Sequence, residues 1–468
     1  MAAYLLFEVM VMLLSRLNDV VWSPWLLGLF LAAGLYYSLR TGFFPLFRIP
    51  LWLRTTFGAM LRRRGRGNGR GISQFQALAT ALASTIGTGS IAGVATAIWF
   101  GGPGAVFWMW VSALLGMMTG CAEKLLSVRY RRAGPAGWLG GPMYYIRDGL
   151  KSPLLAGWFA LACLPATLTG GDMVQSSSIA AALQATFGWD RLAVGAAVAV
   201  LTGLVMVGGI GRIARVSSGL VPAMALLYLG GGAAVLAARA DQIPEAMALI
   251  FCSALRPEAA VGGGMGYTLA AALRYGVARG VFTNEAGLGT SAMAHAAAEV
   301  DCPARQGMWG IVEVCVSTLL VCTATALVIL VSGVYGPADA LVRGALGAVP
   351  PDRLGAPLTA AAFSSVLGPW GGAVVSLSLL LFAFSSILGW SWYGEQSILY
   401  LTGSRRLVPA YRLVFLSCVV LGSVWEGEAV WELVDLCNAL MAIPNLTALL
   451  LLSPQVLREL RDWERTGG

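Results

Sequence analysis

The sequence has few charged residues for its length. Of its 468 residues, 12% are charged and 57% are apolar, whereas a soluble domain carries about a quarter charged residues. So few charges would not cover a soluble protein of this length, and so many apolar residues and aromatics exclude a disordered chain. The net charge of +8 comes from basic residues scattered between apolar runs, which argues against nucleic-acid binding. A polytopic membrane protein remains.

Histidine is nearly absent, and the cysteines form no motif. The single histidine, His295, argues against an HExxH zinc site and a Ser-His-Asp triad. None of the eight cysteines forms a CxxC pair, and we expect them to be small hydrophobes rather than disulfides or metal ligands. An intramembrane enzyme therefore has little support, since paired His or Asp motifs and a large soluble loop are both missing.

The apolar runs predict an all-α protein with about eleven transmembrane helices. A bilayer core roughly 30 Å thick needs about 20 residues per helix. The run 4–14 lacks the features of a cleaved signal peptide, and we expect a retained interfacial helix there. The expected spans are 24–39, 74–100, 104–128, 154–187, 191–207, 219–238, 265–298, 306–332, 371–401, 411–425 and 431–452.

Loop charges predict the orientation. Every second loop is basic, beginning with the loop that holds Arg40, Arg48, Arg54, Arg62, Arg63, Arg64, Arg66 and Arg70. The opposite loops are acidic and hold Asp241, Glu245 and Glu258, or Glu426, Glu428 and Glu432. The positive-inside rule therefore predicts an N-terminus outside and a C-terminal tail, 453–468, in the cytoplasm.

Two spans are interrupted by glycine and polar residues. Residues 83–93 read ASTIGTGSIAG, and residues 281–290 read VFTNEAGLGT. With 1–70 set aside, these spans open two five-helix halves, 71–258 and 259–452, which we expect to be inverted repeats. Paired interrupted spans of this kind indicate the binding site of a secondary transporter.

Unwinding would free backbone groups that hydrocarbon cannot satisfy. The freed N–H groups suit a carboxylate, and the freed carbonyls with nearby hydroxyls suit a small cation. The alternative is that Gly89-xxx-Gly93 and Gly287-x-Gly289 are close-packing notches. Their matched positions favour a binding site. A channel would need polar rings on several continuous helices, whereas the polarity here concentrates at two turns.

Four segments resemble the alanine or glycine:cation symporter family, bacterial carriers with the inverted-repeat fold of the leucine transporter. They are 75–104 (FQALATALASTIGTGSIAGVATAIWFGGPG), 140–145 (GGPMYY), 279–289 (RGVFTNEAGLG) and 382–395 (FAFSSILGWSWYGE). The resemblance implies cation-driven uptake of alanine or glycine by alternating access, in a bacterial-type inner membrane. It implies no cofactor, with Na⁺ as the coupling ion.

The resemblance also implies site residues. The substrate would be bound by Gly87, Thr88, Gly89, Ser90, Gln175, Phe282, Thr283, Asn284 and Glu285. Sodium would be bound by backbone carbonyls of Ala83, Ile86 and Phe382 and by the hydroxyls of Ser385 and Ser386. The two serines have an alternative, which is to bond back to carbonyls of their own helix.

Three positions depart from the family pattern. Ser90 and Asp172 each stand where Asn is usual, and Ser317 stands where Asp is usual. These changes alter polar ligands, and Asp172 adds a carboxylate that would compensate for the missing Asp if it faced Ser317. Sodium is therefore the favoured coupling ion, and a proton is the alternative.

Other ionisable groups at membrane depth have both a functional and a structural interpretation. Glu123 either braces a broken helix or forms an interfacial pair with Lys124. Arg279 either closes an outer gate with a carboxylate or ties loop carbonyls, and Asp172 is a site residue or a helix cap. For Glu313, both the functional and the structural interpretation stay open. We expect His295 to be packed and hydrogen-bonded rather than a proton relay.

Overall fold

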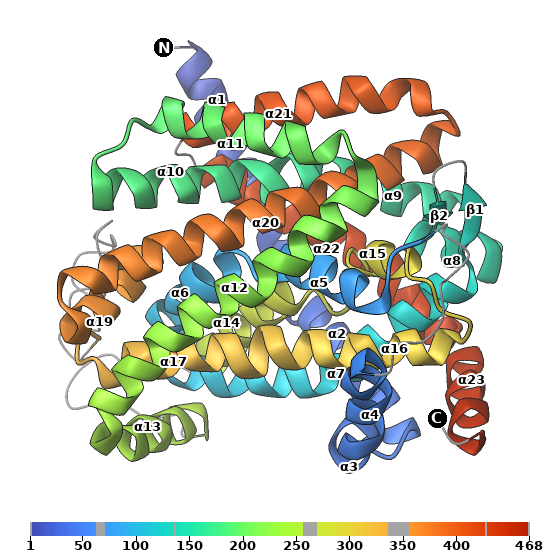
Figure 1. Ribbon diagram of the computed structural model, residues 1–468, viewed down its shortest axis with the longest axis horizontal. Coiled ribbons are helices and arrows are strands. Elements are labelled where there is room, and N and C mark those ends of the chain that lie inside the picture. The colour runs from blue at the N-terminus through green and yellow to red at the C-terminus, as the bar shows by residue number, and fades with distance from the viewer. Residues whose placement is uncertain are drawn as a thin grey trace.

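The computed structural model describes residues 2–61, 71–134, 137–255, 269–335, 355–425 and 428–466. Helices make up nearly all of these residues and form one bundle (Figure 1). The all-α prediction is confirmed, with one small addition. Strands β1 (Arg132–Gly134) and β2 (Gly137–Leu139) pair as an antiparallel hairpin.

The helices follow the predicted spans, with several of them divided. The N-terminal part contains α1 (Ala2–Val21), α2 (Pro24–Arg40), α3 (Phe44–Phe47) and α4 (Ile49–Leu61). Up to residue 255 follow α5 (Gln74–Thr85), η1 (Gly89–Gly93), α6 (Val94–Gly101), α7 (Gly104–Arg129), α8 (Pro142–Gly149), α9 (Pro153–Leu168), η2 (Thr169–Met173), α10 (Val174–Phe187), α11 (Arg191–Met206), α12 (Gly209–Ala238), η3 (Ala240–Gln242) and α13 (Ile243–Leu255). The remainder contains α14 (Leu269–Asn284), α15 (Ala292–Ala296), α16 (Pro303–Val314), η4 (Cys315–Cys322), α17 (Thr323–Val331), α19 (Ala356–Leu367), α20 (Pro369–Thr402), η6 (Arg405–Leu407), α21 (Val408–Val424), α22 (Glu428–Leu451) and α23 (Ser453–Arg465).

Within the described residues, seven helical segments are long and apolar enough to cross a membrane, or nine if two bent pairs each count as one span. The bent pairs are α1 with α2, at 43°, and α5 with η1 and α6, at 54°. Of the other two predicted spans, 191–207 contains α11, and 265–298 contains α14 followed by the second break and α15. Helices α11 and α14 have only 16 residues each. The count of eleven and the inverted repeat stay predictions, and the boundary at 258–259 lies outside the described residues.

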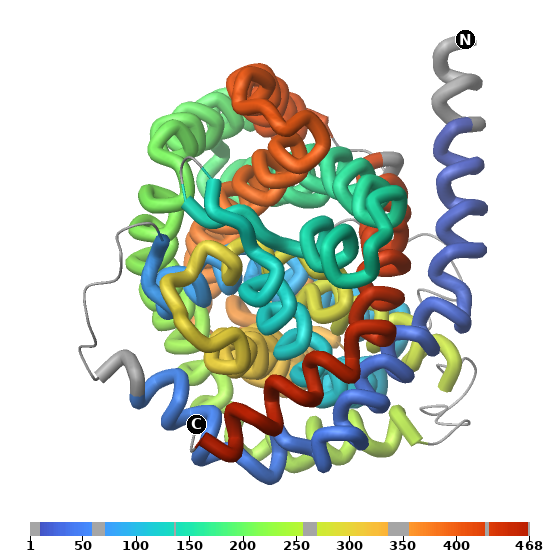
Figure 2. The backbone as a smooth tube through the Cα atoms, turned by 90° about the vertical axis from the view of Figure 1, so that its right-hand side faces the viewer, coloured from blue at the N-terminus to red at the C-terminus, as the bar shows by residue number. Residues whose placement is uncertain are grey.

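The predicted N-terminal interfacial helix is longer than expected. Helix α1 contains the predicted run 4–14 and continues beyond it to Val21. It lies at the edge of the bundle (Figure 2). The Asn18 side chain donates to the backbone carbonyl of Glu432 at 2.7 Å, which attaches α1 to α22. Whether this helix lies in the membrane interface stays a prediction.

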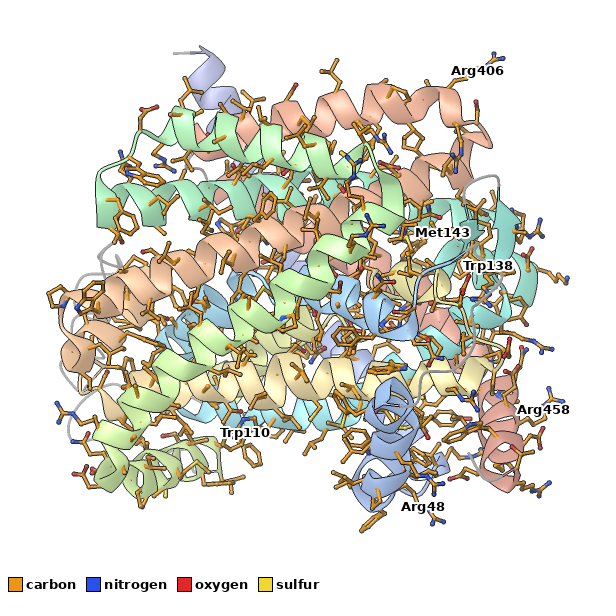
Figure 3. The ribbon with its side chains drawn as sticks, viewed as in Figure 1. Arg48, Trp110, Trp138, Met143, Arg406 and Arg458 are labelled. Carbon is orange, nitrogen blue, oxygen red and sulfur yellow. The ribbon has the colours of Figure 1, made fainter. Side chains whose placement is uncertain are left out.

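Several short elements gather at one end of the bundle. These are α4, α8, the β-hairpin, α15 and α23 (Figure 1), and Arg48, Arg406 and Arg458 lie towards the same end (Figure 3). This is the end that the loop charges predict to be cytoplasmic. The arginines between 62 and 70, and Glu258 and Glu426, lie outside the described residues, and the orientation stays a prediction.

Backbone pairing at this end joins the two interrupted helices. The N–H of Ile72, just before α5, donates to the carbonyl of Ala297, just after α15, at 3.0 Å. The N–H of Glu299 donates back to the Ile72 carbonyl at 2.8 Å. Arg131 adds hydrogen bonds to the carbonyls of Ala298 and Val300. The end of one broken helix is therefore attached to the beginning of the other.

Candidate functional site

The first interrupted helix breaks at Gly87, where other side chains approach the backbone closely. A Cβ on Gly87 would lie 2.5 Å from the Ser386 hydroxyl, and a Cβ on Gly89 would lie 3.0 Å from the Phe282 ring. A Cβ on Gly93 would have no neighbour within 4 Å. Gly93 is therefore not part of a packing notch. Gly87 and Gly89 instead leave room for side chains of α20 and α14.

The unwound turn is held by Gln175 of α10. The Gln175 Oε1 atom accepts from the Thr88 N–H at 3.3 Å, and its Nε2 atom donates to the Gly170 carbonyl at 3.1 Å. The Thr88 hydroxyl is buried and has no hydrogen-bond partner among the described residues. Gln175 and Thr88, both predicted as pocket residues, therefore contact each other directly.

The second interrupted helix breaks after Asn284. Glu285, Gly287 and Gly289 all have positive φ values, of 54°, 99° and 82°. A side chain on Gly287 would overlap the Phe30 ring. Glycine is required there for two reasons, the backbone conformation and the close packing.

Glu123 and Asn445 satisfy the backbone of this second turn. The Gly287 N–H donates to Glu123 Oε1 at 2.8 Å, and the Gly287 carbonyl accepts from Asn445 Nδ2 at 2.8 Å. Asn445 Nδ2 also donates to Glu123 Oε1 at 2.7 Å, and the Tyr145 hydroxyl donates to Asn445 Oδ1. Glu123 is fully buried and thus lies behind the turn as a brace. Asn445 carries no local motif in the sequence.

A small cavity lies between the two turns. The predicted substrate residues that line it are Gly87, Gly89, Gln175, Phe282 and Glu285. Lining residues that the sequence did not indicate include Ser84, Thr85, Trp390, Val434 and Asn438. Ser84 and Thr85 directly precede the predicted turn, and Trp390 lies within the family-like segment 382–395, so adjacency could have suggested them. Val434 and Asn438 of α22 carry no such signal.

The other predicted pocket residues stabilise the turns. The Thr283 hydroxyl donates to the Arg279 carbonyl at 2.8 Å, and Asn284 Oδ1 accepts from the Ala286 N–H at 3.0 Å. The Ser90 carbonyl accepts from the Thr325 hydroxyl at 2.9 Å. Ser90, Thr283 and Asn284, and also Thr88, were predicted to bind the substrate but are not among the residues that line the cavity.

Oxygen atoms cluster where α20 crosses the end of α5. The Ser386 hydroxyl donates to the carbonyls of Ala83, at 3.1 Å, and Ser84, at 2.9 Å. The Ser385 hydroxyl lies 3.1 Å from the same Ala83 carbonyl and 2.8 Å from the Phe382 carbonyl. The alternative, in which the serines bond back to their own helix, therefore holds only for the contact of Ser385 with Phe382. Both contacts of Ser386 reach α5 instead. Ile86, the fifth predicted ligand, is buried at the end of α5.

The three departures from the family pattern all lie in π-helical segments. Ser90 is in η1, Asp172 in η2 and Ser317 in η4, and π-helical turns are frequent at functional sites. Both carboxylate oxygens of Asp172 are buried and have no hydrogen-bond partner among the described residues. However, η2 packs on α20, α21 and α22, whereas η4 packs on α7, α14 and η1. Asp172 and Ser317 therefore lie in different surroundings.

Arg279 lies on one side of the cavity, near Phe282. Its guanidinium carbon is 5.8 Å from the centroid of the Phe282 ring, and Asp435 of α22 lies within range of a long-range electrostatic attraction to it. The Phe282 ring centroid lies 6.4 Å from that of Trp431. Asp435 is thus the carboxylate available to Arg279 for the predicted gate.

Comparisons with known proteins show which family the chain resembles along its whole length. Residues 7–467 match the sodium:alanine symporter family. The sodium/alanine symporter AgcS of Methanococcus maripaludis is 41% identical over 96% of this chain and 96% of that protein. The amino-acid carrier protein AlsT of Bacillus subtilis is 34% identical over 96% of this chain and 91% of that protein. A solved manganese transporter of Eremococcus coleocola has a TM-score of 0.52 at 19% identity, over 83% of this chain and 81% of that chain, a likeness in fold alone.

Proposed function

The chain belongs to the sodium:alanine symporter family, and on that premise we propose that it carries alanine or glycine into the cell together with Na⁺. Membership makes it a membrane transporter that couples an amino acid to a cation, rather than an enzyme. The choice of amino acid and of ion is the proposal. The oxygen cluster between α5 and α20, directly beside the first unwound turn, supports it most strongly.

This cluster has the chemistry of a site for a small monovalent cation. Its oxygens are the carbonyls of Ala83 and Phe382 and the hydroxyls of Ser385 and Ser386, and hard cations prefer oxygen ligands. A hydroxyl can donate or accept, so both serines can turn their lone pairs to an ion. All of these ligands are neutral, which suits a single positive charge.

The cavity has the features of a site for a small amino acid. The Thr88 N–H lies between Gly87 and Gly89, which line the cavity, at the start of a half-helix, where the partial positive charge favours a carboxylate. We propose that the substrate carboxylate takes this N–H from Gln175, whose NH₂ group then turns to the carboxylate. Glu285 and Asn438 line the same cavity and suit the ammonium group, since the buried Asn438 Oδ1 atom has no hydrogen-bond partner among the described residues. The Phe282 and Trp390 rings leave room for a short side chain.

Alternating access requires the two ends of the site to open in turn. The backbone pairing of Ile72 with Ala297, together with Arg131, joins the two broken helices at the end predicted to be cytoplasmic. We propose that these bonds break when the substrate is released to the cytoplasm. Arg279 and Asp435 would control the opposite end.

The test is uptake of radiolabelled alanine into proteoliposomes, with sodium and proton gradients imposed separately. We expect uptake under an inward sodium gradient, competition by unlabelled glycine, and no uptake under a proton gradient alone. Uptake driven by protons without sodium would favour the proton-coupled alternative, with Asp172 as the first residue to test. Failure of alanine, glycine and serine under both gradients would refute symport of small neutral amino acids.

A further inference from the structure

A cluster of buried charges lies behind the second broken helix. The Lys124 Nζ atom lies 3.3 Å from Glu123 Oε2 and 3.2 Å from Glu313 Oε2. The His295 Nε2 atom lies 3.3 Å from the same Glu313 oxygen. All four side chains are fully buried and come from α7, α15 and α16.

The charges of this cluster do not balance unless it holds a proton. Two carboxylates and one ammonium leave a net charge of minus one, and a protonated imidazole brings the sum to zero. An uncompensated charge in a buried site is costly. Glu285 can only add to the negative charge, and Arg131 is bound to the carbonyls of Ala298 and Val300. The other titratable groups that face the cluster are neutral in their ordinary state and are Tyr37, Cys121, Tyr145 and Tyr393.

The surroundings of each carboxylate indicate where the proton lies. Among the residues that the structure describes, the hydrogen-bonding partners of Glu123 are all donors, namely the Gly287 N–H, Asn445 Nδ2 and Lys124 Nζ. Glu123 therefore accepts only and is suited to the ionised form. Glu313 differs, because neither of its oxygens has a hydrogen bond of good geometry among the described residues, and the same is true of His295 Nε2.

The other imidazole nitrogen has a partner that suits either protonation state. The amide of Gln306 contacts His295 Nδ1 at 2.7 Å, and the second polar atom of that amide, Oε1, has no partner among the described residues. An amide can present NH₂ to a bare nitrogen or its oxygen to an N–H. A turn of the Gln306 amide would therefore accommodate a doubly protonated ring.

We propose that His295 is a proton-binding residue whose protonated ring balances Glu313, so that Lys124 and Glu123 form a neutral pair. This differs from the sequence expectation of a merely packed histidine. The cluster reaches the transport site through Glu123, which also holds the Gly287 N–H. Loss of the proton leaves two carboxylates competing for Lys124 and weakens the hold of Glu123 on the second turn. Transport should therefore slow as the pH rises.

The protonation can be read directly, because His295 is the only histidine in the chain. Full-length protein labelled with ¹⁵N-histidine, and carrying a histidine-free tag, would give imidazole signals from one residue. We expect an imidazolium that titrates within about pH 5 to 8. In Glu313→Gln, the Glu123–Lys124 pair is neutral without a proton, and the midpoint should fall by at least about one pH unit, a tenfold weaker affinity for the proton.

The matched control is Glu395→Gln, which changes another buried carboxylate that is not part of this cluster. The Glu395 Oε1 atom lies 2.7 Å from Arg412 Nε. This control variant should leave the His295 midpoint unchanged. A neutral imidazole in the wild-type protein throughout this range, or an equal midpoint in Glu313→Gln, would overturn the proposal. These spectra need no substrate, so their outcome does not depend on the proposed function.

The link to transport rests on the proposed function and needs its own measurement. Initial alanine uptake is followed at equal internal and external pH, so that no proton gradient acts. We expect the wild-type rate to fall as the pH passes the His295 midpoint, and the Glu313→Gln rate to show no such fall. A flat wild-type profile would overturn the link between His295 and the broken helix.

Discussion

The two unwound turns differ in how their backbone groups are satisfied. In the first turn, the Thr88 N–H makes one hydrogen bond of 3.3 Å to a neutral amide. In the second turn, both the N–H and the carbonyl of Gly287 make bonds of 2.8 Å, to a buried carboxylate and to the Asn445 amide. Bonds to ionised groups are stronger than bonds between neutral groups. The first turn is thus available to a ligand, and the second is a fixed support.

This difference assigns separate tasks to two halves of one site. The first turn and α20 gather the oxygens proposed to bind sodium, and the first turn also offers the N–H for the substrate carboxylate. The second turn presents Phe282 and Glu285 to the cavity from a backbone that Glu123 and Asn445 hold in place. Substitutions at the second turn should therefore affect stability first, and those at the first turn should affect binding first.

The largest effect is expected for Glu123→Leu. This variant leaves the Gly287 N–H without its partner and Lys124 with Glu313 alone, and removing one partner of a buried ion pair costs about 3–5 kcal/mol. Thermal unfolding followed by tryptophan fluorescence should show the loss. The control is Asp19→Asn, which breaks the exposed pair with Arg274 and should cost about 0–1 kcal/mol. Equal losses of stability in the two variants would contradict the role of Glu123 as a fixed support of the second turn.

Gln175→Leu should have a smaller effect that depends on substrate. It leaves the Thr88 N–H and the Gly170 carbonyl unpaired, at a cost of about 1–3 kcal/mol. Alanine should recover part of this loss, because its carboxylate takes the Thr88 N–H. The measurement is the melting temperature with and without alanine. If alanine stabilised the variant no more than it stabilises the wild type, the Thr88 N–H would not be a substrate ligand.

Gly89→Ala tests the size of the pocket. The added methyl would lie 3.0 Å from Phe282 and take space from the substrate side chain. Alanine uptake should fall by about tenfold relative to glycine uptake, as expected for one methyl group in a tight pocket. The control is Gly93→Ala, where a Cβ has no neighbour within 4 Å, and the ratio should not change. An unchanged ratio in Gly89→Ala would place the substrate side chain elsewhere.

Much of the fold could be predicted from the sequence because its signals are local. Long apolar runs, basic loops and glycines among hydroxyls are each visible in one stretch of chain, and so the break at Gly87 could be predicted from the residues themselves. The cluster at Ser386 was expected only from the family resemblance. The π-helical segments η1, η2 and η4 could not be predicted, because one extra residue in a turn leaves the hydrophobic pattern nearly unchanged.

Contacts between segments far apart in the sequence could not be predicted either. Asn445 is one polar residue in an apolar span, and its role arises only because α22 brings it beside Glu123 and Gly287. Lys124 resembles an interfacial lysine in the sequence, and only the packing of α16 on α7 places it against Glu313. No spacing along the chain predicts either contact.

The most direct test of the account is the sodium dependence of alanine uptake in Ser386→Ala. Loss of one hydroxyl ligand, worth about 1 kcal/mol, should raise the half-saturating sodium concentration by roughly fivefold. The control is Ser391→Ala, whose buried hydroxyl donates only to the Leu388 carbonyl of its own helix, at 2.8 Å, and which should match the wild type. The account predicts the shift in Ser386→Ala alone. An unchanged sodium dependence in that variant would contradict a sodium site beside the first turn.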